Sequence, residues 1–411
     1  MCLLLVLSRL LVVCCSLRFC TACTTLIAGR GTTVDGSVMA SHSNDGASSS
    51  GGRISRVLAA DWPAGSNRSV AGGAIPQAAH TFAYHTEGYG IMNEFQVGLG
   101  ETTCFAVFKG KAPGIMDIVS LCVALLYGTE LLSGMTNYGV ASLARQIDLG
   151  KIALERANTS RGAVLLMGQL AEKYGYNDNG ESLMVIDPRE GWIFQILPDD
   201  TGASAVWVAQ RVGDNEVGAV TNAFTVRTVD FSNNSTFLFS ANIRDVAARA
   251  TNWTKGTPLD FTAKFSAGEE SRFYSGRRMW SAYQLLAPAT LFSPSYDDFN
   301  RDKPYPATVA VRPKSLNTTA LFRVMRDYYQ DTPFDLTTGL AAGAFGSPDR
   351  WASGLGEEAV PGSWERPIAL YRTLISFVIV RTLPATAYII GLYLSDRFHE
   401  ACATLNRYSR V

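Results

Sequence analysis

Cys23 is the residue of this 411-residue chain whose type and position best suit covalent chemistry. It directly follows Cys20-Thr21-Ala22, and small residues three positions and one position before a bond are typical of a signal-peptide cleavage site. Cleavage after Ala22 would make Cys23 the first residue of the mature chain. Its α-amine, with a reference pKa of about 7.7–8.0, could then take the proton of its own thiol, whose reference pKa is about 8.5. The position therefore predicts a nucleophile that needs no histidine base, although a structural cysteine is the simpler alternative.

The segment before Cys23 has the features of a leader. Residues 2–15, CLLLVLSRLLVVCC, are apolar except for Ser8 and Arg9. This run has the length of a signal peptide's hydrophobic region and is too short to span a bilayer comfortably. We expect residues 1–22 to be a signal peptide and residues 23–411 to be one domain that enters the secretory pathway. An N-terminal membrane anchor stays open, because no positive charge precedes the apolar run.

The composition limits the classes of partner. Lys and Arg together number 36, as do Asp and Glu, so there is no excess charge to attract nucleic acid or an anionic membrane. Four cysteines would remain after cleavage, too few for a disulfide scaffold, and a pairing of Cys104 with Cys122 stays open. Glycosylation sequons in a secreted chain predict a glycoprotein. They begin at Asn67, Asn158, Asn233, Asn234, Asn252 and Asn317.

Several familiar chemistries have no motif in this chain. It contains no Gly-x-Ser-x-Gly elbow, no P-loop, no dinucleotide-binding glycine pattern and no His-Glu-x-x-His motif. Its four histidines, at positions 42, 80, 85 and 399, belong to no recognisable metal-ligand pattern. We therefore expect neither a metal nor another cofactor.

The elements that must position Cys23 alternate between strands and helices along the chain, which predicts an α+β fold. Residues 24–28 and 37–41 read as short strands joined by a turn at Asp35-Gly36. Apolar spacing predicts helices over 114–128, 147–157 and 160–175, the last with Ser160 as N-cap and Gly175 just past its end. Strands are then predicted at 182–196 (a hairpin turning at 188–191), 205–212 and 216–224, and residues 343–363 read as a surface loop.

A second apolar stretch, residues 373–394, is long enough for a membrane span. Arg381 lies near its middle, and a central arginine costs about 2.5–3.5 kcal/mol in a membrane helix. Pro384 follows three residues later. The stretch is better explained as two buried strands with a turn at Leu383-Pro384.

The chain resembles a known family in the segment that begins at Cys23. CTTLIAGRGTTVDGSVMASHSNDG (23–46) looks like the amino-terminal signature of the dipeptidase A (PepD-type) cysteine dipeptidases, relatives of the secernins among the N-terminal-nucleophile (Ntn) hydrolases. Further blocks resemble the family in the same order. They are GYGIMNEFQVGLGETTC (88–104), IALERANTSRGAVLLMGQLAEKYG (152–175), GESLMVIDPREGWIFQIL (180–197), WVAQRVGDNEVGAVTNAF (207–224), DLTTGLAAGAFGSPDR (335–350) and WERPIALYRT (364–373). Beyond residue 394 the chain departs from the family's tail, so we expect a truncated or divergent carboxyl end.

The resemblance implies a four-layer αββα sandwich with the nucleophile at the start of a central strand. It implies hydrolysis of short peptides, above all dipeptides, through an acyl-enzyme on Cys23. Three further residues match positions that act in the family: Asp45 as the acid that bonds the α-amine, Asn222 as an oxyanion donor, and Arg372 as a site arginine. Each has a structural alternative; Asp45 could be a turn residue in SNDG, and Asn222 could cap a strand end.

His42 stands where many related hydrolases carry an arginine, three residues before the conserved acid. Histidine changes charge between pH 5 and 8, whereas arginine does not. If His42 supplies the cation near the thiol, activity should fall between pH 6 and 8, which would suit an acidic, lysosome-like vesicle. The alternative is a strand residue that faces away from the site.

Two other functions fit the same sequence. One is an amidase of this architecture that acts on acyl-amides, because a fold does not decide the substrate. The other is a secreted glycoprotein that keeps the scaffold without activity. For the dipeptidase we expect small peptides as partners, no nucleic acid and no transmembrane segment in the mature chain, and a homo-oligomer stays open.

Overall fold

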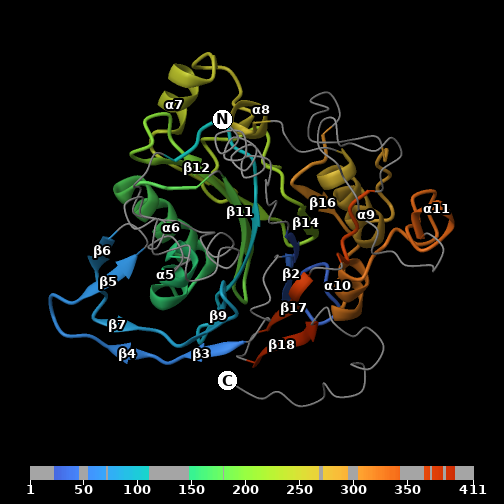
Figure 1. Ribbon diagram of the computed structural model, residues 1–411, viewed down its shortest axis with the longest axis horizontal. Coiled ribbons are helices and arrows are strands. Elements are labelled where there is room, and N and C mark those ends of the chain that lie inside the picture. The colour runs from blue at the N-terminus through green and yellow to red at the C-terminus, as the bar shows by residue number, and fades with distance from the viewer. Residues whose placement is uncertain are drawn as a thin grey trace, which may run out of the picture.

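Two antiparallel sheets form the centre of the molecule (Figure 1). The computed structural model describes residues 23–45, 54–70, 73–110, 148–178, 180–267, 272–294, 304–342, 365–370, 373–382 and 386–393. The six-stranded sheet has the order β16 (Thr308–Ala310), β14 (Glu216–Val220), β1 (Thr24–Ala28), β2 (Val38–Asp45), β17 (Thr373–Thr382), β18 (Thr386–Tyr393). The eight-stranded sheet has the order β15 (Phe237–Phe239), β13 (Ala205–Val212), β12 (Gly191–Pro198), β11 (Glu181–Ile186), β10 (Gly98–Thr103), β9 (Gly90–Asn93), β8 (Tyr84–Thr86), β3 (Ser55–Val57).

The remaining described elements are two small strand pairs and the helices. The pairs are β4 (Ala60–Asp61) with β7 (His80–Thr81), and β5 (Asn67–Val70) with β6 (Gly73–Pro76). The helices are α5 (Asp148–Arg156), α6 (Ser160–Tyr174), α7 (Ile243–Ala250), α8 (Phe261–Phe265), α9 (Arg277–Leu286, preceded by a π-helical turn over Arg272–Gly276), α10 (Thr318–Met325) and α11 (Gly339–Ala342).

The two sheets share an apolar core between them. Ile27, Val38 and Ala40 of the six-stranded sheet pack in one cluster with Met184 and Ile193 of the eight-stranded sheet. Because both faces of the central strands are covered, every residue of β1 and β2 is buried. The strands at the centre of the molecule therefore lie out of contact with solvent.

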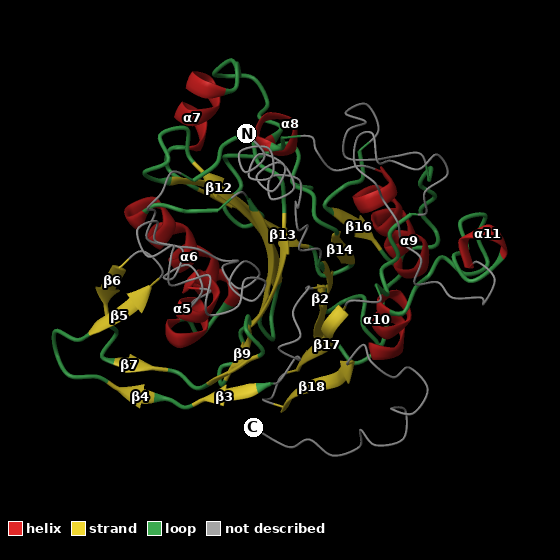
Figure 2. Cartoon of the chain, viewed as in Figure 1, coloured by secondary structure: helices red, strands yellow, loops and turns green. Residues whose placement is uncertain are grey.

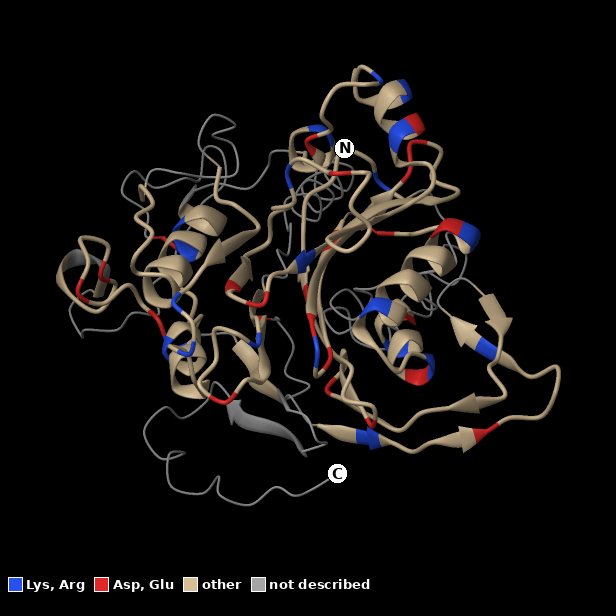
Figure 3. Ribbon diagram, turned by 180° about the vertical axis from the view of Figure 1, so that it is seen from behind, with Lys and Arg blue, Asp and Glu red and all other residues tan. Residues whose placement is uncertain are grey.

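Helices cover the outer face of each sheet (Figure 2). Leu154 of α5 and Met167 of α6 pack against Trp207 and other residues of the eight-stranded sheet. Met279 of α9 and Leu321 of α10 pack in the same way against the six-stranded sheet. Figure 3 shows that the charged residues lie mainly on helices and loops, with a few acidic positions on the strands between the helices.

Most predicted elements agree with the structure. The predicted strands at 24–28 and 205–212 are β1 and β13, and the apolar stretch at 373–394 forms β17 and β18, two paired strands, as expected. The predicted helix over 147–157 is α5, and that over 160–175 is α6. No helix in the described part of the chain is long and apolar enough to cross a membrane.

Several boundaries differ from the prediction. The strand predicted at 216–224 is β14, which ends at Val220, so Asn222 lies beyond the strand. Strand β2 continues beyond residue 41 to Asp45, because β17, more than 300 residues later, pairs with its whole length. The N-cap of α6 is Thr159, whose side chain accepts a hydrogen bond from the Gly162 amide at 3.0 Å; Ser160 instead donates to Asp187 at 2.8 Å.

Some predictions fall on residues that the structure does not describe. The α+β class is confirmed by the mixture of antiparallel sheets and helices. The leader at 1–22, the helix at 114–128, the loop at 343–363, Cys122 and Arg372 all lie outside the described residues. The predictions made for these segments stay predictions.

Candidate active site

Cys23 directly precedes β1, a strand with neighbours on both sides in the six-stranded sheet. Its side chain is fully buried, and its Sγ donates a hydrogen bond to Oε1 of Glu101, 3.3 Å away on β10 of the other sheet. The thiol therefore lies between the two sheets, at the start of β1. The position at the start of a central strand agrees with the expectation for this cysteine.

Arg278 on α9 fixes the main chain at this point. Its Nη1 donates to the carbonyl oxygen of Cys23 at 2.8 Å and to Oγ1 of Thr24 at 3.1 Å. Its Nη2 donates to the carbonyl oxygen of Thr221 at 2.8 Å and to Oδ1 of Asn222 at 2.9 Å, and its Nε donates to the backbone of Tyr274. A guanidinium group has five N–H donors, and all five are used. Arg278 therefore positions the site and keeps no donor for a substrate.

Asn222 follows β14 and is joined to Cys23 through the same guanidinium group. Its backbone has a φ of 67°, the left-handed region that asparagine tolerates better than most residues. Its Nδ2 donates one hydrogen bond to the carbonyl oxygen of Thr103 at 2.8 Å. Within the described part of the chain no acceptor is paired with the second N–H of this amide, which can therefore bind a ligand, the property that an oxyanion donor needs.

Asp45, at the end of β2, lies in a charged network beside Cys23. Its carboxylate forms a buried ion pair with Arg366 and accepts hydrogen bonds from Ser43 Oγ at 3.4 Å and from Thr373 Oγ1. Both Asp45 and Arg366 have no exposed surface. Both the charge and the backbone of Asp45 act on the pKa of the Cys23 thiol, so the two residues are neighbours.

The surroundings of the thiol favour its protonated form. Burial raises the pKa of Cys23 well above its usual range, and the carboxylates of Glu101 and Asp45 raise it further, against a smaller opposite effect of the Asp45 backbone. Only the thiolate is a strong nucleophile. A base must therefore remove this proton before the sulfur can attack.

Glu101 belongs to a pair of buried carboxyl groups. Glu181 lies opposite Thr103 in the β10–β11 register, two residues from the position opposite Glu101, so the two side chains are diagonal neighbours. Burial raises the pKa of both carboxyls, and the charge of Glu101 raises the pKa of Glu181 further. Glu101 is 2% exposed and Glu181 has no exposed surface.

His42 lies on the face of β2 that Cys23 shares. In the β1–β2 register, His42 is opposite Thr25, two residues along from Cys23 on the same face. Its ring packs edge-on against Tyr89 and Phe377, with centroids 6.2 and 5.4 Å away, and comes so close to β10 that a Cβ at Gly100 would lie 2.8 Å from that of His42. The alternative that it faces away from the site is wrong.

The predicted charge change of His42 is also wrong. Burial lowers its pKa to about 3, so the ring is neutral throughout the range from pH 5 to pH 8. A neutral imidazole cannot replace the permanent cation of an arginine. The step in activity between pH 6 and 8 that the sequence suggested therefore does not follow from this residue.

Cys23, His42 and Glu101 could also hold a cation. Their donor atoms all lie within 4.8 Å of one another, and a thiolate, an imidazole and a carboxylate together suit Zn²⁺. No sequence motif indicates this set, because the three residues come from three separate segments. Zinc on the thiol would block its attack on a carbonyl, so such a cation would inhibit the nucleophile chemistry.

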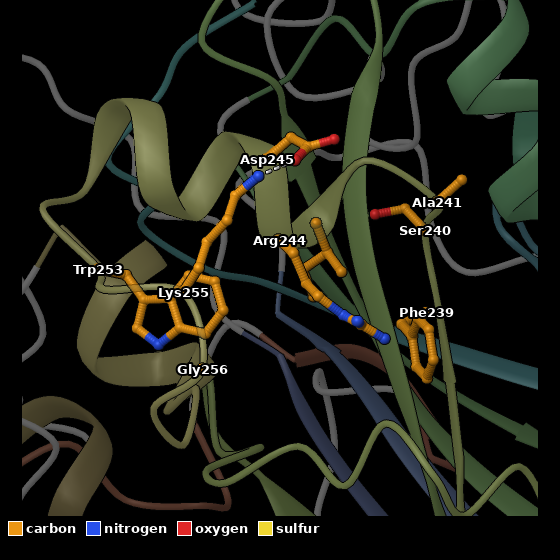
Figure 4. Close-up of a pocket in the computed structure, with 9 residues that line it drawn as sticks. Phe239, Ser240, Ala241, Arg244, Asp245, Trp253, Lys255 and Gly256 are labelled. Atoms are coloured by element: carbon orange, nitrogen blue, oxygen red, sulfur yellow. Dashed lines mark hydrogen bonds and ion pairs between the residues drawn. The ribbon is translucent and has the colours of Figure 1, made fainter.

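A larger pocket lies beside α7 (Figure 4). Its lining includes Trp253, Arg244 and an ion pair between Lys255 and Asp245 at 2.7 Å. No cysteine lines it. The residues with covalent chemistry are therefore those around Cys23.

The structure brings together four of the five predicted site residues: Cys23, His42, Asp45 and Asn222. The fifth, Arg372, lies outside the described residues, but Arg366 of the same WERPIALYRT segment contacts Asp45. Sequence reasoning missed Glu101, Arg278 and Arg366. Glu101 lies within a block that resembled the family, whereas nothing in SGRRMW distinguishes Arg278.

Proteins similar to this chain carry dipeptidase names. A "probable dipeptidase" of Latilactobacillus sakei is 22% identical over 325 residues, which cover 77% of this chain and 62% of that protein. A "probable dipeptidase A" of Streptococcus pyogenes serotype M3 (strain SSI-1) is 24% identical over 201 residues, which cover 48% of this chain and 40% of the relative. The chain thus spans less than two thirds of the length of these relatives.

The family assignment comes from a match to a protein-family profile. The profile of Peptidase family C69 matches residues 130–388, more than half of the chain. This region includes Asn222, Arg278 and Arg366 but begins after Cys23. The chain belongs to Peptidase family C69.

Proposed function

We propose that this protein is a cysteine dipeptidase whose nucleophile is Cys23, exposed as an N-terminal residue by cleavage after Ala22. One observation carries the proposal: the Arg278 guanidinium group binds both the carbonyl oxygen of Cys23, the residue with the buried thiol, and the side-chain amide of Asn222. A nucleophile and an oxyanion donor held in fixed relation are what acyl transfer requires. The names of the relatives supply the substrate class.

The reaction then proceeds in two acyl transfers. The free α-amine of Cys23 takes the thiol proton, and the sulfur attacks the carbonyl carbon of the scissile peptide bond. The second N–H of Asn222 stabilises the negative charge on the carbonyl oxygen. The α-ammonium returns the proton to the leaving amine, which departs and leaves a thioester. Water, deprotonated by the same amine, attacks the thioester, releases the acid and restores the thiol.

Two further parts of the proposal concern architecture and location. The helices outside each sheet support the four-layer αββα sandwich of the Ntn hydrolases as the fold. Entry into the secretory pathway is supported by the exposure of every sequon asparagine. Amino-terminal sequencing and intact mass, before and after glycosidase treatment, test the cleavage and the glycans together.

The decisive experiment replaces the nucleophile. Cys23→Ala should lower the hydrolysis of alanyl-alanine by about 10⁴-fold or more while leaving the unfolding temperature near that of the wild type. Cys104→Ala, which removes another fully buried thiol, is the matched control and should stay active. A chelator should leave the wild-type rate undiminished. If the Cys23→Ala protein, or a form that still carries residues 1–22, hydrolysed the dipeptide at the wild-type rate, the proposal would be wrong.

A further inference from the structure

We propose that Glu101 and Glu181 form the binding site for the free α-ammonium group of the substrate, so that the enzyme accepts peptides with an unblocked amino terminus. This inference rests on the proposed function and names the substrate feature that the site recognises. It separates a peptidase for free dipeptides from an amidase for N-acylated compounds, two activities that the same fold can support.

The first observation is that the two carboxyl groups lack partners. No described group meets Oε2 of Glu101, or either oxygen of Glu181, with full hydrogen-bonding geometry. The hydroxyls of Tyr89 and Thr103 approach them, and the two carboxyls also approach each other. Because the pKa of Glu181 is raised, it keeps its proton and shares it with Glu101, which leaves one buried negative charge for which the described residues supply no cation.

The second observation is that both neighbouring guanidinium groups are already committed. Arg278 uses all of its donors on the carbonyl groups of Cys23, Thr221 and Tyr274 and on two side chains. Arg366 forms the buried ion pair with Asp45. Among the described residues neither forms an ion pair with Glu101 or Glu181, so the missing positive charge can come with a ligand.

The third observation is the distance from the nucleophile. In a dipeptide, the α-nitrogen lies two bonds, about 2.5 Å, from the carbonyl carbon that is attacked. Reacting atoms approach to about 3–3.5 Å, so the group that binds the ammonium must lie close to the sulfur. Oε1 of Glu101 is 3.3 Å from Sγ of Cys23. A carboxylate at this position meets the α-nitrogen of a substrate whose first peptide bond lies over the thiol.

The fourth observation is the space beside Glu101. A small pocket of about 10 Å³ is lined by Glu101, Tyr89, Leu99 and Leu183, together with Gly90, Gly100 and Gly150. This volume is close to the lower limit for one water molecule, which is about the size of an ammonium group. A Cβ at Gly90 would lie 2.5 Å from Leu154 and one at Gly100 would lie 2.4 Å from Met184, so the chain packs closely around this space.

Binding of the ammonium would also change the state of the thiol. In the structure, Glu101 accepts the hydrogen bond of Sγ and its charge opposes ionisation of Cys23. An ammonium group that binds Glu101 takes over this acceptor and offsets its charge. The thiol proton is then free to move to the amine of Cys23, so substrate binding favours the nucleophilic form.

The test compares substrates that differ in one group. Alanyl-alanine carries the α-ammonium, lactyl-alanine replaces it with a neutral hydroxyl of similar size, and N-acetyl-alanyl-alanine blocks it. Wild-type kcat/KM should be about 100-fold higher for alanyl-alanine than for lactyl-alanine, the effect expected for a buried charge-assisted contact. Glu101→Gln should reduce this preference below tenfold by lowering the rate on alanyl-alanine alone, largely through KM.

Two further variants test whether the effect is specific to the Glu101–Glu181 pair. Glu181→Gln should show the same loss of preference, which keeps the test valid if Glu101→Gln does not fold. Asp187→Asn removes another buried carboxylate, just past the opposite end of β11, and should keep the wild-type preference.

The outcomes separate the inference from the proposed function. Equal wild-type rates on alanyl-alanine and lactyl-alanine, both lost in Cys23→Ala, would overturn the ammonium site and leave the cysteine hydrolase intact. An equal loss on both substrates in Glu101→Gln would assign the carboxylate to the enzyme's own thiol or amine, and the inference would again be wrong. Hydrolysis that persisted in Cys23→Ala would overturn the proposed function itself.

Discussion

Buried charges are neutralised by neighbouring residues on one side of Cys23 but not on the other. On one side, Asp45 is matched by Arg366 and by two hydroxyl groups, and Arg278 has an acceptor for each of its donors. On the other side, Glu101 and Glu181 lie next to each other with oxygens that no described donor satisfies well. The satisfied side belongs to the scaffold, because its charges are neutralised within the fold. The unsatisfied side is where a substrate can contribute free energy.

The comparison predicts opposite effects for two conservative changes from acid to amide, and the larger effect is on the satisfied side. Asp45→Asn leaves the Arg366 guanidinium buried without its counter-charge, which should lower the free energy of unfolding by about 3–5 kcal/mol. Asp245→Asn is the control, since its ion pair with Lys255 is 64% exposed on each side and should contribute about 1 kcal/mol or less. Denaturant unfolding measures both, and equal small losses would contradict the comparison.

Glu181→Gln should be neutral or stabilising in the absence of substrate, and increasingly so as the pH rises. The pKa of Glu181 is raised in the folded protein, so the folded chain retains a proton that the unfolded chain loses above about pH 4.3. Wild-type stability therefore falls as the pH rises above this value, by up to about 1.4 kcal/mol per pH unit for one such group. Unfolding temperatures of the two proteins at pH 5 and pH 8 should diverge. A difference that shrank over this range would mean that a cation already pairs with the carboxylate.

The smallest effect is expected at His42, the uncharged neighbour of both sides. Because its pKa is lowered to about 3, His42→Gln should leave the shape of the kcat/KM profile between pH 6 and 8 unchanged. The rate itself should fall by less than about tenfold, since the ring is neutral and packs against Tyr89 and Phe377. Loss of an alkaline limb in the variant would show that His42 is charged in the working enzyme.

Local patterns were sufficient to predict the elements around the nucleophile. Alternation and turn residues gave β1 and the start of β2, and the arginine and proline within residues 373–394 correctly favoured strands over a membrane span. The full length of β2 was not predictable, because its last residues pair with β17, which follows hundreds of residues later. The family resemblance at residues 23–46 predicted that Cys23 and Asp45 lie close together. A hydrophobic pattern could not have predicted this.

The missed residues act through tertiary contacts that no local pattern encodes. Arg278 reaches Cys23 across a separation of 255 residues, because α9 packs on the six-stranded sheet beside β1. Glu101 in GLGETT reads as a solvent-facing strand residue, and only the second sheet and the thiol in front of it make it buried. His42 shows the same limit: its type suggested a pH switch, whereas its burial removes the charge.

The hydrogen bond from Arg278 to Cys23 has a consequence for the order of maturation. Arg278 holds the carbonyl oxygen of Cys23, and Glu101 accepts from its sulfur, so neither contact depends on the backbone nitrogen. Under the proposed processing, the precursor would fold around the same geometry while that nitrogen is still an amide that cannot accept a proton. The unprocessed chain would then be a zymogen that already has the fold of the active enzyme but cannot hydrolyse a peptide, because it lacks the free amine. A single proteolytic cut would start its activity without any rearrangement of the fold.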